Sequence, residues 1–307
     1  MTNPIHEPIA ELRQVTKMFG SKKAVNQVSF TIEKGSITAI LGPNGAGKST
    51  AISMMLGLKD ASEGKVLLFG QSPKDLKVRE KIGAMLQEVS VMDGLRTREI
   101  INLIRGYYPN PLSLDDIALL SGLTPEELNK WAVKMSGGQK RKLSFALAIA
   151  GNPELLFFDE PTVGLDTSAR RLFWQTVRKL ADQGKTILFT THYLQEADDM
   201  ADRILLFHQG QVAADGTPEA IKSKLTRKSV SFIVDADHRQ VKELLREVPG
   251  VTDVFENNGR LNAVTDDTDT ALAALFRAGL AVRDVRIDQG SLDEAFDQLT
   301  MDQGEAV

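Results

Sequence analysis

Short runs of apolar residues recur in the second half of the chain, separated by stretches with a helical period. The runs cover residues 155–158, 186–190 and 204–207. Between the first two runs, residues 169–182 form an amphipathic pattern whose buried side consists of Leu172, Phe173, Val177 and Leu180. Fully apolar strands that alternate with amphipathic helices are typical of an α/β core with a parallel sheet covered on both faces.

The first half of the chain begins with a series of short elements. Strand-like stretches at residues 11–15, 24–32 and 36–41 are separated by turn residues at Gly20-Ser21 and Lys34-Gly35. The pattern then predicts a helix over 50–58, a strand over 65–69, a short helix over 75–82 and a strand over 83–87. This order continues the α/β pattern toward the N-terminus.

A helical segment interrupts the alternation of strands and helices. From residue 96 to residue 128 the apolar positions recur at helical spacing, with breakers at Pro109, Pro111, Gly122 and Pro125. We therefore expect a small helical insertion over about residues 88–150, within a first domain that covers residues 1–225.

A second, smaller domain is expected at the C-terminus. Residues 216–228 are polar and rich in lysine and arginine, which indicates a boundary. The following pattern predicts strand 229–234, helix 239–248, strands 251–256 and 260–264, helix 268–278 and strand 282–287. This order is typical of a ferredoxin-like α+β domain, expected over residues 229–307. A last helix is predicted over 291–299, because Ser291 and Glu294 have capping-box spacing.

Composition narrows the class of protein. The 307 residues suit two domains, and 42% hydrophobic with 25% charged residues is typical of a globular protein. We find no apolar run long enough to span a membrane and no secretion signal, and the absence of cysteine agrees with a reducing compartment. A net charge of −4 argues against nucleic acid as the main partner, so none is expected.

The clearest motif is the stretch LGPNGAGKST, which follows a predicted strand and fits G-x-x-x-x-G-K-[ST] from Gly42 to Ser49. Its glycines allow backbone N–H groups to approach phosphate oxygens, and the helix that starts near Lys48 directs its positive end at the anion. Lys48 is expected at the β- and γ-phosphates of a nucleotide, and Ser49 at Mg²⁺. The alternative is a glycine-rich turn that matches by chance. The residues expected to contact ATP here are Gly42, Pro43, Asn44, Gly45, Ala46, Gly47, Lys48, Ser49 and Thr50.

A second motif places two carboxylates after a buried strand. The run LLFFDE ends in Asp159 and Glu160, and open α/β sheets bind ligands at this end of their strands. We expect Asp159 to orient the Mg²⁺ shell and Glu160 to polarise the attacking water as a general base. Taken alone, two acids in this position would more often cap a helix or lie in a solvated loop. The preceding Lys48 favours the catalytic interpretation.

The segment Met135-Ser136-Gly137-Gly138-Gln139, followed by a basic helical stretch, resembles the signature of ATP-binding cassette (ABC) proteins. A serine and two glycine amides at a helix start form an anion site, whereas the bland alternative is a glycine-rich helix cap. The resemblance implies the P-loop NTPase fold of ABC ATPases. It also implies a head-to-tail dimer in which Ser136, Gly137, Gly138 and Gln139 of one subunit close on ATP bound by the other. Met135 departs from the usual leucine, a change expected to affect packing little.

Four further positions match the same family one at a time. Phe19 resembles the aromatic residue that stacks on adenine, although a lone phenylalanine would more often lie in a core. Gln87 resembles the glutamine that senses Mg²⁺ and the γ-phosphate, and Asp166 in GLD resembles the loop that crosses the dimer interface. His192 looks like the switch histidine at the γ-phosphate. The resemblance thus gives catalytic roles to Lys48, Gln87, Glu160 and His192, and Mg²⁺ contacts to Ser49, Gln87 and Asp159.

The forms EPTVGLD and THYLQEAD, and the C-terminal SLDEAFDQL, look like ATPase subunits of bacterial exporters whose permease is a separate chain. The resemblance implies an ATPase on the cytoplasmic side of the cell membrane, as a homodimer or paired with a similar subunit, that powers drug or antibiotic efflux. We expect the permease to contact the insertion beside Gln87, near Tyr107-Tyr108. The alternatives are a soluble ABC ATPase acting on ribosomes or DNA, and an importer ATPase with a regulatory tail.

Overall fold

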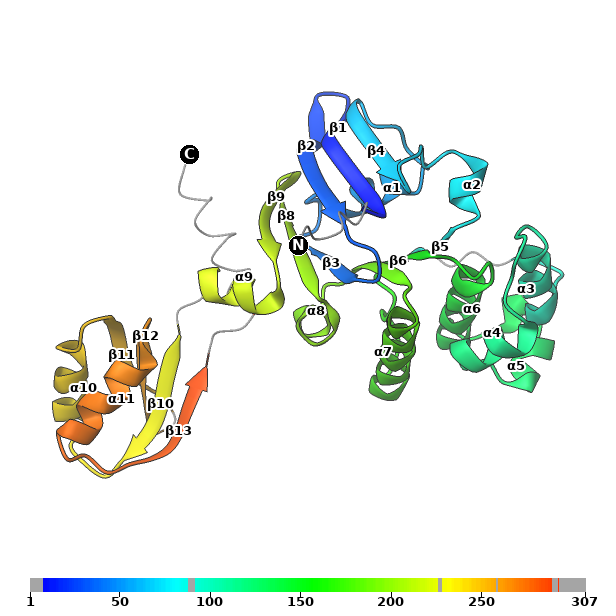
Figure 1. Ribbon diagram of the computed structural model, residues 1–307. Coiled ribbons are helices and arrows are strands. Elements are labelled where there is room, and N and C mark those ends of the chain that lie inside the picture. The colour runs from blue at the N-terminus through cyan, green and yellow to red at the C-terminus, as the bar shows by residue number, and fades with distance from the viewer. Residues whose placement is uncertain (1–7, 88–91, 226–227, 258, 289–291, 293–307) are drawn as a thin grey trace, which may run out of the picture. The chain divides into compact units, whose positions relative to one another are not determined.

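The computed structural model describes residues 8–87, 92–225, 228–257, 259–288 and 292. Their contacts divide the chain into two compact units, Met1–Thr217 and Pro218–Val307. The first unit contains two sheets and a group of helices, and the second contains one sheet and a smaller group of helices (Figure 1).

The larger sheet of the first unit has six strands in the order β5-β6-β7-β3-β8-β9. They are β5 (Ile82–Met85), β6 (Leu155–Asp159), β7 (Thr186–Thr190), β3 (Ile37–Leu41), β8 (Arg203–His208) and β9 (Gln211–Gly216). The pairs from β5 to β8 are parallel, which confirms the predicted parallel sheet, and β9 pairs antiparallel with β8 at the edge. The apolar-run criterion missed β9 because its residues alternate between exposed and half-buried positions.

The central strands are apolar because both of their faces are covered. Phe157 packs into a core with Leu12 and Ile40, whereas the next residue, Phe158, points to the other face. There its ring centroid lies 5.7 Å from that of Phe145 and 5.6 Å from that of Phe173. The Phe158–Phe173 pair is edge-to-face, and such a pair contributes about 0.5–1.5 kcal/mol beyond its burial. These contacts fix the helices α6 (Gly137–Ile149) and α7 (Thr167–Asp182) against the sheet.

The smaller sheet covers the opposite face and is antiparallel, in the order β2-β1-β4. Its strands are β1 (Ala10–Phe19), β2 (Lys22–Ile32) and β4 (Glu63–Leu68). The helix α1 (Lys48–Met55) buries Ile52, Met54 and Met55 in the core that this sheet shares with the six-stranded one, and α2 (Leu76–Arg79) leads into β5. The core therefore holds the start of α1 at a defined position.

The helical insertion has an apolar core of its own. Its elements are α3 (Thr97–Arg105), α4 (Leu114–Ser121), α5 (Pro125–Asn129), the 3₁₀ turn η1 (Ala132–Lys134) and α6. Ile100, Ile117, Leu128 and Leu143 meet in this core, one from each α-helix. Because α6 also packs on the main sheet through Phe145, it joins the insertion to the α/β core.

Two further helices follow strands of the six-stranded sheet along the chain. The helix α8 (Leu194–Met200) follows β7, and α9 (Pro218–Leu225) follows β9. The polar segment 216–228, which the sequence analysis interprets as a domain boundary, contains this last helix, which starts at Pro218 and buries Ile221. The contacts group α9 with the second unit, whereas the sequence places the boundary after residue 225.

The second unit contains a four-stranded antiparallel sheet in the order β11-β12-β10-β13. Its elements are β10 (Ser229–Val234), α10 (His238–Arg246), β11 (Val251–Asn257), β12 (Arg260–Thr265), α11 (Thr268–Arg277) and β13 (Val282–Asp288). Phe232, Leu245 and Leu275 form its core, one from the sheet and one from each helix. The helix predicted over 291–299 lies outside the described residues, apart from Leu292.

Candidate functional site

The loop between β3 and α1 lines a pocket at the carboxyl end of the parallel strands, which we call the phosphate-loop pocket. Its lining residues are Phe19, Lys22, Ala24, Asn44, Gly45, Gly47, Lys48, Ser49, Thr50, Gln87 and Glu160. The structure thus brings together residues from the N-terminal strand, the glycine-rich loop and the ends of β5 and β6. Gly42, Pro43 and Ala46 belong to the same loop but do not line this pocket, and Ala46 is buried beneath it.

Lys48 is held across the glycine-rich loop by the loop's own backbone. Its Nζ donates to the carbonyl oxygen of Gly42 at 2.7 Å and to that of Pro43 at 3.1 Å. Burial lowers the pKa of Lys48, and the negative charges of Glu160 and Asp159 act against this shift. The ammonium group is therefore fixed at the pocket and faces two carboxylates.

Two glycines of the loop are required by contacts inside the protein rather than by space for phosphate. A Cβ atom at Gly47 would lie 2.4 Å from the carbonyl oxygen of Ala24, and one at Gly42 would lie 2.3 Å from that of Phe207. Gly45 has open space at this position. The sequence-based reason, that a side chain would intrude on the phosphates, is therefore incomplete for Gly42 and Gly47.

We predict that Gly47→Ala destabilises the protein by about 2 kcal/mol or more, through overpacking and an unfavourable backbone conformation. Gly47 has a φ angle of 107°, and the atom that a methyl group would meet belongs to the backbone. The shift of the thermal unfolding midpoint measures this effect. Gly137→Ala is the matched control, because a Cβ atom there meets nothing within 4 Å. Equal midpoints for the two variants would contradict the explanation.

The carboxyl end of β6 presents the two predicted acids in different environments. Asp159 is buried and accepts a hydrogen bond from the Thr190 hydroxyl at 2.5 Å. The N–H of Glu160 donates to the Thr190 carbonyl and hydroxyl oxygens at 3.1 Å and 3.0 Å. Glu160 has a φ angle of 49°, and such strain in a non-glycine residue is concentrated at functional sites. Thr190 on β7 thus positions both acids.

Two further predicted residues converge on the side chain of Glu160. The amide Nε2 of Gln87 donates to Glu160 Oε2 at 3.0 Å, and His192 Nδ1 lies 3.7 Å from the same oxygen. His192 is half-exposed, and its ring centroid lies 4.1 Å from that of Tyr193. The Glu160 carboxylate can therefore accept a proton from a water molecule while Gln87 and His192 hold its orientation.

Phe19 lies at the edge of the pocket and is 46% exposed, so it is not a core residue. The Nζ atoms of Lys17 and Lys59 lie 5.4 Å and 5.0 Å from its ring centroid. An exposed aromatic face flanked by cations can stack on a flat, electron-rich ring such as a nucleobase.

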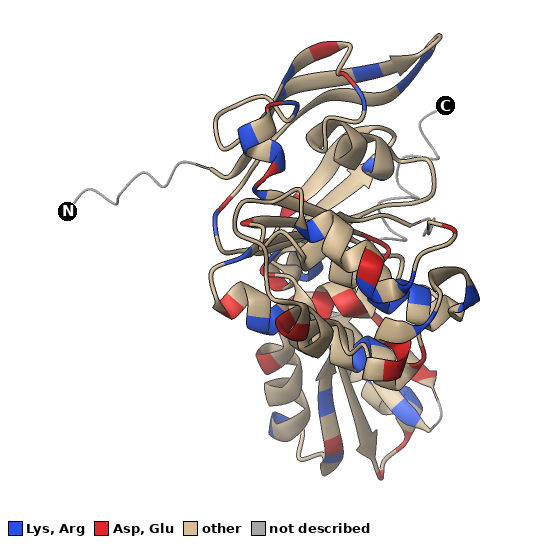
Figure 2. Cartoon of the chain, turned by 90° about the vertical axis from the view of Figure 1, so that its right-hand side faces the viewer, with Lys and Arg blue, Asp and Glu red and all other residues tan. Residues whose placement is uncertain are grey.

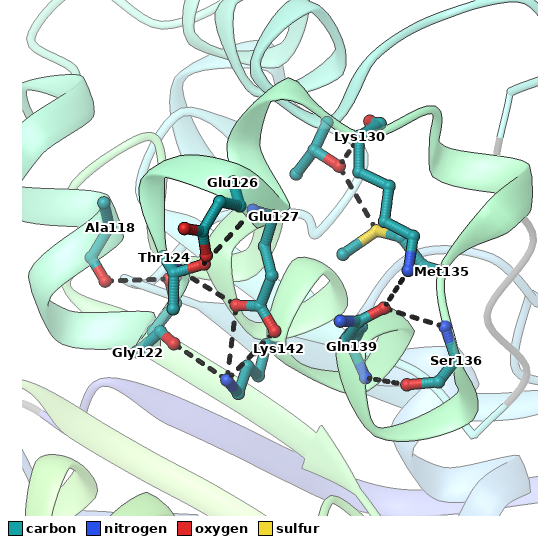
Figure 3. A network of polar contacts seen from close by, with 12 residues as sticks. Ala118, Gly122, Thr124, Glu126, Glu127, Lys130, Met135, Ser136, Gln139 and Lys142 are labelled. Atoms are coloured by element: carbon teal, nitrogen blue, oxygen red, sulfur yellow. Dashed lines mark hydrogen bonds and ion pairs between the residues drawn. The ribbon is translucent and has the colours of Figure 1, made fainter.

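The signature segment, residues 135–139, lies at the start of α6 and not in the phosphate-loop pocket. Ser136 is the N-cap: its Oγ accepts from the N–H of Gln139 at 3.3 Å, and Gln139 Oε1 accepts from the N–H of Ser136 at 3.0 Å. Lys130 Nζ donates to the same Gln139 oxygen at 2.9 Å (Figure 3). This segment therefore caps α6 within the chain, and Gly137 and Gly138 have open space at Cβ. Its predicted contact with ATP stays a prediction.

Lys142, which lies on α6, ties this helix to the rest of the insertion. Lys142 Nζ donates to the carbonyl oxygen of Gly122 at 2.9 Å and lies 3.3 Å from the carboxylate of Glu127 (Figure 3). Glu127 in turn accepts from the N–H of Thr124 at 2.9 Å and caps α5. Lys142 and Glu127 thus tie α6 to α5 and to the end of α4.

Asp166 also has a role within the chain. It is the N-cap of α7, and its Oδ1 accepts from the N–H of Ala169 at 2.8 Å. The structure does not bring Asp166 into the phosphate-loop pocket. Its predicted place at a dimer interface stays a prediction.

Sequence reasoning missed four residues in or near the pocket. Lys22 and Ala24 line it directly, and Thr190 supports the two acids. Arg141, on α6, donates from Nη1 to the carbonyl oxygen of Leu86 at 3.5 Å. Burial lowers the pKa of Arg141, and the charges of Glu160 and Asp159 oppose the shift. The position of Lys22 after a turn that begins next to Phe19 was the one signal in the sequence.

The described residues hold no group of three histidine, cysteine or acidic side chains that could bind a metal ion by itself. Ser49 and Asp159 offer a hydroxyl and a carboxylate, the hard oxygen ligands that Mg²⁺ prefers. Mg²⁺ commonly takes its remaining ligands from substrate phosphates and water. The residues present fit a magnesium ion that enters together with a nucleotide.

No helix in the described part of the chain is long and apolar enough to cross a membrane. The chain is similar to known proteins over most of its length. It is 36% identical to the daunorubicin/doxorubicin resistance ATP-binding protein DrrA of Streptomyces peucetius, over 94% of this chain and 92% of that protein. It is 38% identical to the Nod factor export ATP-binding protein I of Rhizobium johnstonii, over 78% of this chain and 79% of the relative.

Among solved structures, the fold resembles a dimeric ATP-binding cassette in a post-hydrolysis state bound to ADP and Pi, with a TM-score of 0.62 and 27% identity. The alignment covers 68% of this chain and 98% of that one. Residues 25–163 match the family described as ABC transporter. This span contains the phosphate loop, the signature segment and the two acids after β6. The chain therefore belongs to the ABC transporter family, as an ATP-binding, ATP-hydrolysing subunit of the exporter type.

Proposed function

We propose that two copies of this chain, or this chain and a similar subunit, hydrolyse ATP between them and thereby drive export through a separate membrane permease. The observation that carries this proposal is the convergence of Gln87 and His192 on the Glu160 carboxylate, in a pocket that also holds Lys48. Lys48 binds the β- and γ-phosphates, Phe19 stacks on the base, and Glu160 takes the proton of the attacking water. His192 and Gln87 keep the Glu160 carboxylate oriented toward the γ-phosphate.

Mg²⁺ is part of the proposed site. Ser49, Gln87 and Asp159 would hold it against the phosphates, and when bound it neutralises charge that develops on the transferred phosphoryl group. The chain's own contribution is to keep Asp159 buried, with its Oδ1 accepting a hydrogen bond from the Thr190 hydroxyl. Ser49 follows Lys48 at the start of α1, where the helix dipole also favours an anion.

The start of α6 supports a nucleotide site that is shared between two subunits. Ser136 and Gln139 cap α6, and the neighbouring Gly137 and Gly138 have open space where a side chain would stand. An uncovered helix start can bind an anion, and the first turn of α6 contains no acidic residue that would take this place. The γ-phosphate held by a second subunit supplies that anion in the proposed dimer. Asp166 and its loop would lie at the same interface.

The permease is proposed to dock on the insertion, beside the segment that begins at Gln87. At the end of α3, Leu103 is 41% exposed and Tyr107 is 71% exposed, so both leave apolar surface uncovered. Tyr108 is less available to a partner, because its ring packs against Gly151. A Cβ atom at Gly151 would lie 2.4 Å from this ring. Of the two tyrosines named from the sequence, Tyr107 is the one free to contact a partner.

We predict that Tyr107→Asp releases the protein from membranes without changing its ATPase rate in solution by more than about twofold. The side chain is exposed, so its loss should not affect folding, and a charge at an apolar contact opposes docking. The measurement is the fraction of protein that sediments with membranes of the source cells. Leu76→Asp, at a residue that is 73% exposed on α2, is the matched control. Equal sedimentation of both variants would contradict this docking site.

The cargo and location follow from the same proposal. The name of the Streptomyces peucetius relative supports drug or antibiotic efflux, and the name of the Rhizobium johnstonii relative supports export. The ATPase would bind peripherally at the cytoplasmic side of the cell membrane. Basic and acidic residues are interspersed along the described ribbon (Figure 2). The net charge of −4 favours a protein partner over nucleic acid. A host that lacks the chain should lose resistance to the exported drug, and daunorubicin is the first compound to test.

The second unit is proposed to be a ferredoxin-like domain. Its β-α-β-β-α-β order, and the strand order β11-β12-β10-β13, support this assignment. All the residues to which we assign nucleotide contacts lie in the first unit. The domain is therefore proposed to act in assembly rather than in chemistry.

A further inference from the structure

A buried carboxylate lies behind the switch histidine. Glu196, on α8, is only 6% exposed, yet both of its oxygens accept hydrogen bonds. Thr162 Oγ1 donates to Oε1 at 2.6 Å, and Thr191 Oγ1 donates to Oε2 at 2.6 Å. Arg170 Nε lies 3.4 Å from Oε1 and supplies the opposite charge. A buried carboxylate is tolerated when it is paired in this way.

The partners of Glu196 come from three different segments. Thr162 lies two residues after Glu160, Thr191 directly precedes His192, and Arg170 lies on α7. The two threonines are themselves buried. Glu196 therefore joins the chain that leaves the acidic end of β6 to the chain that leaves β7.

A continuous series of contacts leads from this cluster to His192. The Thr191 hydroxyl that donates to Glu196 also accepts from the N–H of Tyr193 at 3.0 Å. The Arg170 guanidinium lies 4.2 Å from the centroid of the Tyr193 ring, which lies 4.1 Å from the ring centroid of His192. His192 Nδ1 then lies 3.7 Å from Glu160 Oε2. The histidine is thus supported from behind while its other side is exposed.

We infer that Glu196 is a positioning residue for ATP hydrolysis, which acts by fixing the backbone and the ring that orient His192 toward Glu160. This inference rests on the proposed function, because it assigns His192 a role at the γ-phosphate. Since the cluster lies outside the residues that line the phosphate-loop pocket, it governs the reaction geometry and not nucleotide binding. A displacement of about 1 Å at a reacting group can cost on the order of 10²-fold in rate.

Glu196→Gln keeps the shape of the side chain but removes the charge that holds Arg170 and replaces one acceptor oxygen by a donor. We expect kcat for ATP hydrolysis to fall about 10- to 100-fold and KM to change less than about threefold. Thr162→Val is a second variant, because it removes one donor without changing the size of the side chain. Thr176→Val is its matched control, since this largely buried hydroxyl donates only to the Leu172 carbonyl in α7.

The deciding experiment compares ATP hydrolysis by the full-length wild type, Glu196→Gln, His192→Ala and the double variant. If Glu196 acts through His192, the double variant should be no slower than His192→Ala alone. Losses that multiply would overturn the inference and leave the proposed function intact. So would Glu196→Gln and Thr162→Val proteins with lower melting midpoints but the wild-type kcat. A His192→Ala protein with the wild-type kcat would overturn the assigned role of His192 itself, and this inference with it.

Discussion

Replacing Glu160 by glutamine is expected to lower the rate of ATP hydrolysis by about 10²–10⁴-fold while ATP still binds. The Glu160 carboxylate accepts from Gln87 at 3.0 Å and lies 3.7 Å from His192, so the substitution removes the base without removing its neighbours. Lys48 and the loop that binds phosphate are unchanged. Because ATP binds and persists, we expect the variant to accumulate as an ATP-dependent dimer in size-exclusion chromatography.

Glu154→Gln is the matched control for this experiment. Glu154 directly precedes β6 at the end opposite Glu160, where it pairs with Lys34 and Lys81, outside the phosphate-loop pocket. This variant should hydrolyse ATP at close to the wild-type rate and should not accumulate as a dimer. A Glu160→Gln protein with the wild-type rate would remove Glu160 from the role of general base.

Replacing Lys48 by alanine is expected to act at an earlier step, on binding itself. Hydrogen bonds to charged groups contribute about 1.5–3 kcal/mol, which corresponds to a loss of affinity of roughly 10- to 150-fold. The Lys48 ammonium is fixed at the pocket by the carbonyl oxygens of Gly42 and Pro43, so no other group can take its place without rearrangement. Titration with a fluorescent ATP analogue measures the effect directly.

Lys185→Ala is the matched control for Lys48→Ala. Lys185 is also partly buried, burial lowers its pKa, and it donates to the Asn152 backbone and side-chain oxygens, but it does not line the pocket. We expect its loss to leave nucleotide affinity unchanged. Lys48→Ala should form no ATP-dependent dimer, in contrast to Glu160→Gln. Equal affinities for Lys48→Ala and wild type would contradict the assignment of the phosphate site.

Local sequence pattern is enough to predict the parallel sheet and the elements that carry the site. The strand β6 is apolar up to Asp159 because Phe157 and Phe158 are buried on opposite faces, and a fully apolar run before two acids indicates this directly. The glycine-rich loop is equally local, since spacing alone brings Lys48 to the start of α1. Residues that act through their own neighbours in sequence are therefore predictable.

What the sequence could not predict depends on contacts between distant segments. Thr190 contacts the two acids from 30 residues away or more, and Glu196 joins Thr162 to Thr191. Ser136 and Asp166 also act as helix caps, a role that is seen only once the backbone conformation is known. The constraint on Gly47 comes from the Ala24 carbonyl in another strand. No pattern of apolar and polar positions contains these pairings.

The dimer with shared nucleotide sites is tested most directly by cross-linking two different single-cysteine chains. The protein has no cysteine of its own, so Asn44→Cys in one chain and Gly138→Cys in a second, larger tagged chain can pair only across chains. Asn44 lines the phosphate-loop pocket, and Gly138 has open space at Cβ. With both chains also carrying Glu160→Gln, we predict a disulfide between the two sizes of chain that forms with ATP and not without it. A mixed-size product that is absent with ATP, or equally abundant without nucleotide, would contradict the shared site.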